Sequence, residues 1–240
     1  MLPLRFHELA VKNNWTLLEQ IENLPNQGFL LFLEDKRLSL KDLSEPSWSS
    51  FYIDFLDSQF LLRLKKVHNQ SNLLKKAIGF KPIDQCIVWD ATAGLCRDSM
   101  VLAQLGYNVI AVERSVVLFE LICDAIERAK NSDELCEGLS RLKLLCGDSK
   151  ILLANLSEEQ RPEVIYLDPM YPDLNKSSQP KKEMQILRKL LGSDDNVDEL
   201  LAIARVVAKK KVILKNNPRT KLILKPKHSL KSKSVRFDVY

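Results

Sequence analysis

The segment at residues 165–172, Ile-Tyr-Leu-Asp-Pro-Met-Tyr-Pro, carries the side chains best suited to chemistry. An Asp-Pro pair at a strand end keeps the backbone extended, because proline restricts the preceding residue and has no N–H group. The carboxylate of Asp168 and the carbonyl oxygen of Pro169 can then accept both hydrogen bonds of an exocyclic amine, while Tyr171 offers a face to a planar base. Such acceptors position a weakly nucleophilic amine and stabilise its developing charge without a strong base. We predict that Asp168, Pro169 and Tyr171 are catalytic.

A second group of candidate residues surrounds two earlier predicted strands. The turn from Asp90 to Gly94 consists of small residues, which let the backbone approach a ligand closely, and it leads into Arg97 and Asp98. Glu113 lies 23 residues beyond Asp90, at the end of the next strand, where its carboxylate can accept hydrogen bonds from two ribose hydroxyls. The loop lacks the further glycines that bring a pyrophosphate against a helix start. The pattern therefore predicts a cofactor that contains adenosine and disfavours a dinucleotide.

Two more polar side chains, Asp148 and Ser149, follow a predicted strand at residues 142–146. At the same sheet edge they could bond the amino group of an adenine. Both residue types also commonly cap the first turn of a helix. The sequence leaves both roles open, and one residue can fill both.

These candidates belong to a region in which short strands alternate with helices. The predicted strands lie at residues 86–90, 108–112, 142–146, 164–167 and 212–214, with helical spacing between them. Parallel strands need crossover connections, and the crossover helices cover both faces of the sheet. Residues 222–224 and 235–240 could add an antiparallel hairpin. We therefore predict an α/β, Rossmann-like fold with a mostly parallel sheet and a C-terminal antiparallel hairpin.

The first 80 residues lack this alternation. Strands are expected at residues 29–33, 38–40 and 51–55, and helical spacing runs from 59 to 78 with a polar interruption at 68–72. We assign residues 1–80 to a small β-containing accessory region and residues 81–240 to the catalytic domain. A chain of 240 residues suits one substantial core with such an appendage.

Composition narrows the class of protein. No apolar run reaches the roughly 18 residues of a membrane span, and the amino terminus is not a signal peptide, so we expect a cytoplasmic protein without a membrane partner. The five cysteines include no Cys-x-x-Cys pair and are expected to be reduced, without a metal. No pattern indicates an oligomeric state.

Positive charge is concentrated near the carboxyl end. Residues 205–237 contain twelve Lys or Arg and no Asp or Glu, so the rest of the chain is net negative. This distribution suits a polyanion, because cations that neutralise phosphates release counterions. A lysine-rich surface that only aids solubility explains it as well.

Five segments together resemble the RsmJ family, which methylates the N2 amine of a guanine in bacterial small-subunit ribosomal RNA. They lie at residues 90–98, 112–114, 166–172, 181–184 and 236–240. The resemblance covers residues 84–240 well and the first 80 weakly. It implies a class I methyltransferase fold with a seven-stranded sheet, S-adenosylmethionine as cofactor, and small-subunit ribosomal RNA or the assembled subunit as partner.

The resemblance also implies a set of site residues. The cofactor site would consist of Arg97, Asp98, Glu113, Arg114, Asp148, Ser149 and Asp168, the last of which also faces the target amine. From charge alone we expect Lys181, Lys182 and the basic carboxyl end to face RNA.

Three departures from the family pattern bear on activity. Cys96 stands where the family usually has glycine, so we expect its Cβ to crowd the methionine part of the cofactor or to resist a positive φ. A glycine-rich basic loop is replaced by residues 67–72, and a more basic turn by residues 215–218. Two alternatives therefore stay open: a methyltransferase for another planar amine in RNA, DNA or protein, and a catalytically impaired RNA-binding factor of ribosome assembly.

Overall fold

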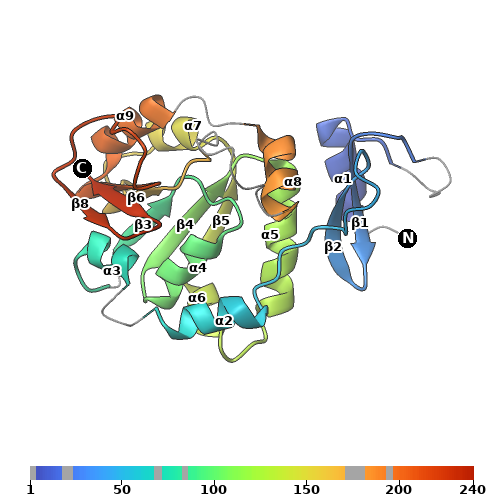
Figure 1. Ribbon diagram of the computed structural model, residues 1–240, viewed down its shortest axis with the longest axis horizontal. Helices are drawn as coiled ribbons and strands as arrows, with labels where there is room; N and C mark the ends of the chain where they lie inside the picture. Colours follow the sequence, from blue (N-terminus) through green and yellow to red (C-terminus); the bar gives the residue numbers. More distant parts are fainter. Residues whose placement is uncertain (1–3, 18–23, 68–71, 83–85, 171–181, 193–196) are drawn as a thin grey trace.

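The computed structural model describes residues 4–17, 24–67, 72–82, 86–170, 182–192 and 197–240. Its centre is a seven-stranded sheet in the order β5-β4-β3-β6-β7-β9-β8 (Figure 1). The strands are β3 (Ile87–Asp90), β4 (Asn108–Glu113), β5 (Leu142–Cys146), β6 (Val164–Leu167), β7 (Lys211–Asn216), β8 (His228–Lys231) and β9 (Arg236–Val239). Strands β3 to β7 pair in parallel, whereas β9 is antiparallel to both β7 and β8. The predicted sheet and C-terminal hairpin are confirmed.

Helices cover both faces of the sheet. On one face lie α2 (Ser58–Lys65), α3 (Leu73–Ile78), α4 (Arg97–Gln104) and α5 (Val116–Ala129); on the other lie α7 (Ser149–Ala154) and α9 (Val197–Val207). Strand β6 shows why the sheet needs both layers: Val164 and Tyr166 enter the first core, and Ile165 and Leu167 enter the second. All four side chains are buried, as expected for a central parallel strand whose alternate residues point to opposite faces.

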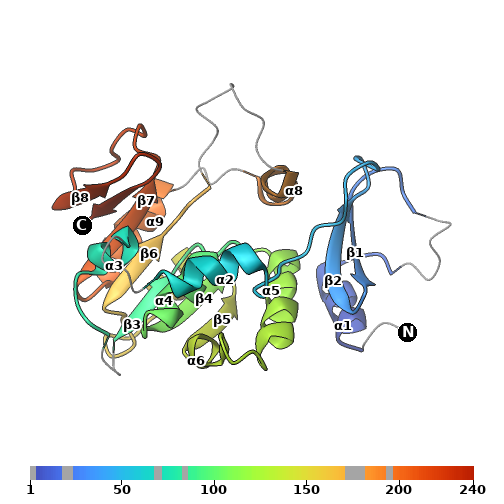
Figure 2. The same ribbon diagram turned by 60° about the horizontal axis from the view of Figure 1, so that its bottom comes forward.

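The N-terminal hairpin lies at the end of the molecule opposite the C-terminal hairpin (Figures 1 and 2). It pairs β1 (Phe29–Glu34) with β2 (Arg37–Asp42), next to α1 (Leu4–Asn13). The remaining helices are α6 (Cys136–Ser140) and α8 (Lys182–Leu191). The Lys189 ammonium of α8 lies 2.9 Å from the Asp42 carboxylate at the end of β2, which ties the hairpin to α8.

The helices α2 and α3 confirm the predicted helical segments before the sheet. Asp57 caps the first turn of α2, and Asn72 caps that of α3. Gly79 ends α3 in the left-handed conformation (φ 73°), where glycine avoids the steric cost of a Cβ. Both helices contribute to the core that α4 and α5 share. Part of the region predicted as accessory thus packs directly on the seven-stranded sheet.

Two predicted strands are wrong. Residues 222–224 form no strand, and β9 pairs instead with β8, which follows Pro226. The side chains of Leu222 and Leu224 are 50% and 42% exposed, so they lack the burial that would hold a strand there. Residues 51–55 make only one isolated bridge, between Phe51 and Leu40.

A buried ion pair explains why β9 contains both an arginine and an aspartate. The Arg236 guanidinium lies 2.9 Å from the Asp238 carboxylate, and both side chains are at least nine-tenths buried. Asp238 also accepts hydrogen bonds from Asn216 (2.7 Å) and Ser229 (2.6 Å), so one carboxylate joins β7, β8 and β9. Arg236 donates further to the carbonyl oxygen of Thr220 in the turn after β7 (2.9 Å). This pair is therefore a structural element of the hairpin.

No helix in the described part of the chain has the length and apolar character to cross a membrane. The described residues also include no cluster of three or more His, Cys, Asp or Glu that could hold a metal ion.

Candidate active site

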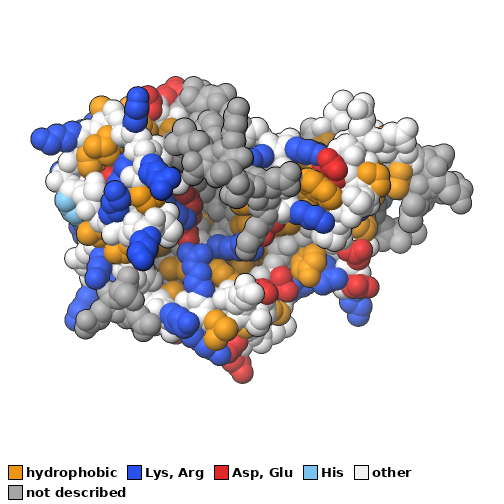
Figure 3. Space-filling view, in the orientation of Figure 1, with side chains coloured by type: hydrophobic (Ala, Val, Ile, Leu, Met, Phe, Trp, Pro, Cys, Tyr) orange, Lys and Arg blue, Asp and Glu red, His pale blue; other side chains and the backbone are white. Residues whose placement is uncertain are grey.

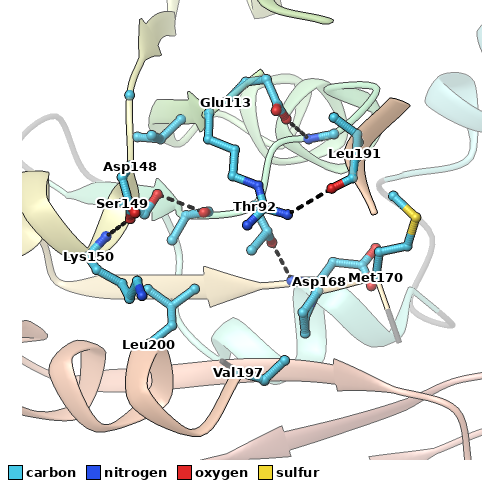
Figure 4. A pocket seen from close by; sticks show the side chains of 16 residues that line it. Thr92, Glu113, Asp148, Ser149, Lys150, Asp168, Met170, Leu191, Val197 and Leu200 are labelled. Carbon is cyan, nitrogen blue, oxygen red and sulfur yellow. Dashed lines mark hydrogen bonds between the residues drawn. The ribbon is translucent and has the colours of Figure 1, made fainter. Parts of the chain in front are cut away.

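A cavity of about 270 Å³ lies at the carboxyl ends of β3, β4, β5 and β6 (Figure 4). The residues that directly follow each of these strands form one wall of the cavity. Residues from α9 and the end of α8 close it from the other side. The lining consists of Ala91, Thr92, Gly94, Val112, Glu113, Arg114, Gly147, Asp148, Ser149, Lys150, Asp168, Pro169, Met170, Leu191, Val197 and Leu200. The expected convergence of strand ends therefore produces a concave site, as parallel α/β sheets generally do.

Glu113, the last residue of β4, is held rigidly at the cavity wall. Its side chain is 5% exposed. One carboxylate oxygen accepts a hydrogen bond from the Gly94 N–H (3.0 Å) and the other accepts one from the Ser115 N–H (2.8 Å). A carboxylate is a good acceptor for the two hydroxyls of a ribose diol. The geometry suits the ribose-binding role predicted from the sequence.

The loop after β3 is joined to the loop after β6. The N–H of Asp168 donates to the Thr92 hydroxyl (2.6 Å), and the N–H of Ala91 donates to the Tyr166 carbonyl (3.0 Å). Asp90 accepts from the Thr92 N–H (3.1 Å) and from the Ser99 hydroxyl. Burial raises the pKa of Asp90 to about 7, although these hydrogen bonds act against the shift. Buried Asp90 thus stabilises the loop after β3 through hydrogen bonds, while Asp168 lines the cavity.

Asp148 and Ser149 combine structural roles with a place in the cavity lining. Asp148 is the N-cap of α7 and accepts a hydrogen bond from the Lys150 N–H (2.8 Å). The Ser149 hydroxyl donates to the Ala91 carbonyl (2.7 Å), which joins the loops after β5 and β3. The capping alternative is therefore confirmed for Asp148, and both residues still line the cavity.

The two predicted arginines lie in different places. Arg114 lines the cavity, and its guanidinium donates to the Leu191 carbonyl at the end of α8 (3.4 Å). Arg97 is not part of the lining; its guanidinium lies 2.9 Å from the Glu183 carboxylate on α8. Arg97 thus connects the start of α4 to α8, and Arg114 connects the end of β4 to α8.

Asp98 and Asp168 meet through a lysine that the sequence reasoning did not single out. The Lys215 ammonium, near the end of β7, lies 2.7 Å from the nearer carboxylate oxygen of each. Asp98 also pairs with Arg63 of α2 and accepts from the Tyr166 hydroxyl (2.6 Å). Two acids and two cations, from α2, α4, β7 and the segment after β6, therefore form one network beside the cavity.

The pKa values of the two acids in this network are shifted in opposite directions. Burial opposes ionisation of Asp98, but the charges of Lys215 and Arg63 outweigh it and hold the pKa of Asp98 well below its usual range. Burial raises the pKa of Asp168; Lys215 acts against this shift and Asp98 adds to it. Lys215 itself has a raised pKa because the two carboxylates outweigh its burial. It stays protonated at neutral pH and fixes the Asp168 carboxylate.

Several predicted residues lie outside the cavity or outside the described residues. Tyr171 and Lys181 belong to residues 171–181, which the structure does not describe, so their roles stay predictions. Lys182 is exposed at the start of α8. Pro169 lines the cavity beside Asp168.

Cys96 adopts the strained conformation that its sequence position suggested. Its φ is 59° and its ψ is 16°, in the left-handed region that favours glycine. The side chain is fully buried in the core and is not part of the cavity lining, and crowding of the cofactor by its Cβ stays a prediction. The cost of this substitution is therefore backbone strain.

The side chains that line the cavity fit S-adenosylmethionine. The apolar side chains of Val112, Val197 and Leu200 can pack on a flat adenine, and Figure 4 shows Glu113 across the cavity from Val197 and Leu200. Asp148 adds an acceptor at the third strand end. The volume is near the lower end of the range for small-molecule sites, roughly 300 Å³.

Comparisons with known proteins agree with this geometry. Residues 12–240 match the family model SAM_MT, which describes SAM-dependent methyltransferases. "Ribosomal RNA small subunit methyltransferase J" of Thioalkalivibrio sulfidiphilus is 37% identical over 238 residues, which are 98% of this chain and 92% of that protein. The protein of the same name from Pseudoalteromonas atlantica is 39% identical over 219 residues, 89% of this chain and 85% of the relative.

A solved structure is similar over nearly the whole chain. The crystal structure of a SAM-dependent methyltransferase from Neisseria gonorrhoeae superposes with a TM-score of 0.72 at 32% sequence identity, covering 92% of this chain and 85% of that one. Fold, cavity and sequence therefore lead to the same assignment. The chain belongs to the RsmJ family of SAM-dependent methyltransferases.

Proposed function

We propose that this protein methylates the exocyclic N2 amine of a guanine in small-subunit ribosomal RNA. The observation that carries the proposal is the position of Asp168 and Pro169. They follow β6 directly and line the same cavity as Glu113 of β4. A methyl donor bound through Glu113 and a planar amine held by Asp168 would then occupy neighbouring positions. The curated relatives are named for ribosomal RNA of the small subunit, which supports RNA as the substrate.

The cofactor supplies an electrophilic methyl group, and the protein positions the acceptor. The guanine amine is a poor nucleophile because its lone pair is delocalised into the ring. The Asp168 carboxylate and the Pro169 carbonyl would accept its two N–H bonds and stabilise the charge that develops on nitrogen. Lys215 holds the Asp168 carboxylate at 2.7 Å. We further propose that Tyr171 stacks on the base.

The cofactor-binding residues are proposed in two groups. Glu113, Arg114, Asp148 and Ser149 line the cavity and would contact the cofactor directly. Arg97 and Asp98 would act through neighbours, Arg97 by holding α8 and Asp98 through Lys215. The substrate is the RNA itself or the assembled subunit, and we place the protein in the cytoplasm, where subunits are assembled.

Labelled cofactor tests this function against the other substrates considered. The protein is incubated separately with undermethylated small ribosomal subunits, free RNA, DNA and bulk protein, and the RNA is digested to nucleosides for mass spectrometry. We expect label in N2-methylguanosine. Label found only in protein, DNA or methylated adenosine would contradict the proposal. Failure of calorimetry to detect the cofactor at millimolar concentration would favour an impaired assembly factor.

Asp168 provides the matched variant for this assay. Asp168→Ala should lose at least 100-fold in turnover, because an acceptor for the reacting amine is removed. The side chain is about one-third exposed. Circular dichroism and the calorimetric affinity for the cofactor check that the variant remains folded and competent to bind. Unaltered turnover in a folded variant would refute the assigned role.

A further inference from the structure

A second, larger cavity of about 740 Å³ lies beside the first. It is formed by elements far apart in the sequence: α2, α3, the first turn of α4, the end of β7 and the turn between β8 and β9. The cofactor contacts proposed above do not use it. Its volume falls within the roughly 300–1,000 Å³ typical of ligand sites.

The lining combines an apolar floor with a cationic rim. The floor includes Leu62, whose side chain is 56% exposed, together with Leu73 and Val235. The rim carries three cations and one acid, namely Arg63, Lys66, Lys215 and Asp98. Arg63 and Lys215 are paired with Asp98, whereas Lys66 has no ion pair within the described part of the chain. The cavity is therefore net positive, with one cation available for an anionic ligand.

The two cavities adjoin each other at Asp168 and Lys215. Lys215 lines the second cavity, and its ammonium lies 2.7 Å from Asp168, which lines the first. A ligand in the second cavity thus ends next to the acceptor proposed for the amine. Lys and Arg side chains also gather over the neighbouring C-terminal hairpin in Figure 3, which extends the positive field beyond the cavity.

We propose that the second cavity binds a nucleotide of the RNA strand that carries the target amine. The base would lie against the apolar floor, and its phosphate would be neutralised by Lys66. A nucleotide joins a flat, largely apolar ring to one negative charge per unit, which matches this pairing of floor and rim. An acidic peptide matches it less well, because its carboxylates carry no flat apolar group. The inference rests on the proposed function, since it takes RNA as the substrate.

Two variants with a matched control test the cavity. Lys66→Glu reverses the unpaired rim cation, and Leu62→Glu places a charge on the exposed part of the floor. Lys76→Glu is the control, because Lys76 is exposed on α3, is not part of the cavity lining and has no ion pair among the described residues. The probe is a fluorescent 12-nucleotide single-stranded RNA with one guanine, and binding is measured by anisotropy at several salt concentrations.

The expected result separates the variants clearly. Lys66→Glu and Leu62→Glu should each weaken probe binding about tenfold, and Lys66→Glu should reduce the slope of log affinity against log salt by about one, because one phosphate contact is lost. Lys76→Glu should bind within about twofold of the wild type. Cofactor affinity by calorimetry should be unchanged in all three. A probe with 6-thioguanosine should photocrosslink to residues 58–67 or 228–240.

Other outcomes overturn the proposal or separate it from the proposed function. If both cavity variants bind RNA like the control, or the crosslink maps elsewhere, the cavity is not the nucleotide site, even where the wild type methylates RNA. If the wild type methylates no RNA but the binding and crosslinking results appear as expected, the proposed activity fails and the cavity assignment stands. Equal displacement of the probe by polyglutamate would assign the cavity to acidic protein and overturn it.

Discussion

Replacing Lys215 with methionine should destabilise the protein in a pH-dependent way. The ammonium lies 2.7 Å from carboxylate oxygens of both Asp98 and Asp168. Two opposite charges about 4 Å apart interact by about 4 kcal/mol at an effective dielectric constant of about 20. The Lys215 and Asp168 side chains are 28% and 37% exposed, and methionine avoids the cost of burying a charge. We therefore expect the free energy of unfolding at pH 7 to fall by about 2 kcal/mol.

The pH dependence follows from the acid with the lowered pKa. In the wild type, burial raises the pKa of Asp98, but the charges of Lys215 and Arg63 lower it by more than burial raises it. The folded-state pKa therefore lies below the unfolded value of about 4. Ionised Asp98 thus stabilises the folded state above that unfolded pKa, and this contribution is lost as pH falls through the folded pKa. Lys215→Met removes much of the contribution. The difference between the two proteins should be full near pH 7 and should shrink below about pH 4.

Urea unfolding followed by circular dichroism at pH 7 and at about pH 2 measures both effects. Lys209→Met is the control, because its ammonium lies 3.9 Å from the Glu163 carboxylate in a partly exposed pair and should contribute less than about 1 kcal/mol. A double-mutant cycle with Asp98→Asn should give a coupling energy of about 1 kcal/mol or more. If Lys215→Met matches the Lys209→Met control at both pH values, the network does not stabilise the fold as argued.

Three further predictions concern single residues. Glu113→Gln should weaken S-adenosylmethionine binding by about 10- to 100-fold in calorimetry, since a charged hydrogen bond contributes about 1.5–3 kcal/mol; a change within twofold would remove Glu113 from the site. Cys96→Gly should be more stable than Cys96→Ala by about 1 kcal/mol in urea unfolding, because φ is 59° and alanine keeps the left-handed strain; the reverse order would contradict the strain. Asp238→Ala should lower the unfolding free energy by about 3–5 kcal/mol, because buried Arg236 loses its partner; a loss below 1 kcal/mol would show that the pair is dispensable.

Local patterns in the sequence predicted most of the fold. The alternation of apolar strands and helices after residue 84 identified β3 to β7, and the helical spacing of residues 59–78 predicted the helices before them. The C-terminal hairpin was predicted correctly, but one of its two strands was placed wrongly. Leu222-Ile-Leu224 has the composition of a strand but lacks a buried face. The division between residues 80 and 81 stays a prediction.

The sequence by itself determined which residues stand at strand ends: Glu113 ends β4, Asp148 and Asp168 come shortly after β5 and β6, and parallel strands bring their carboxyl ends to one edge. Only the tertiary structure decided that Arg63, Asp98 and Lys215 form one network and border a second cavity. These three side chains come from α2, α4 and β7, and no local periodicity links them. Spacing along a chain specifies contacts within an element and between consecutive strands, whereas contacts between distant elements depend on how the helices pack on the sheet.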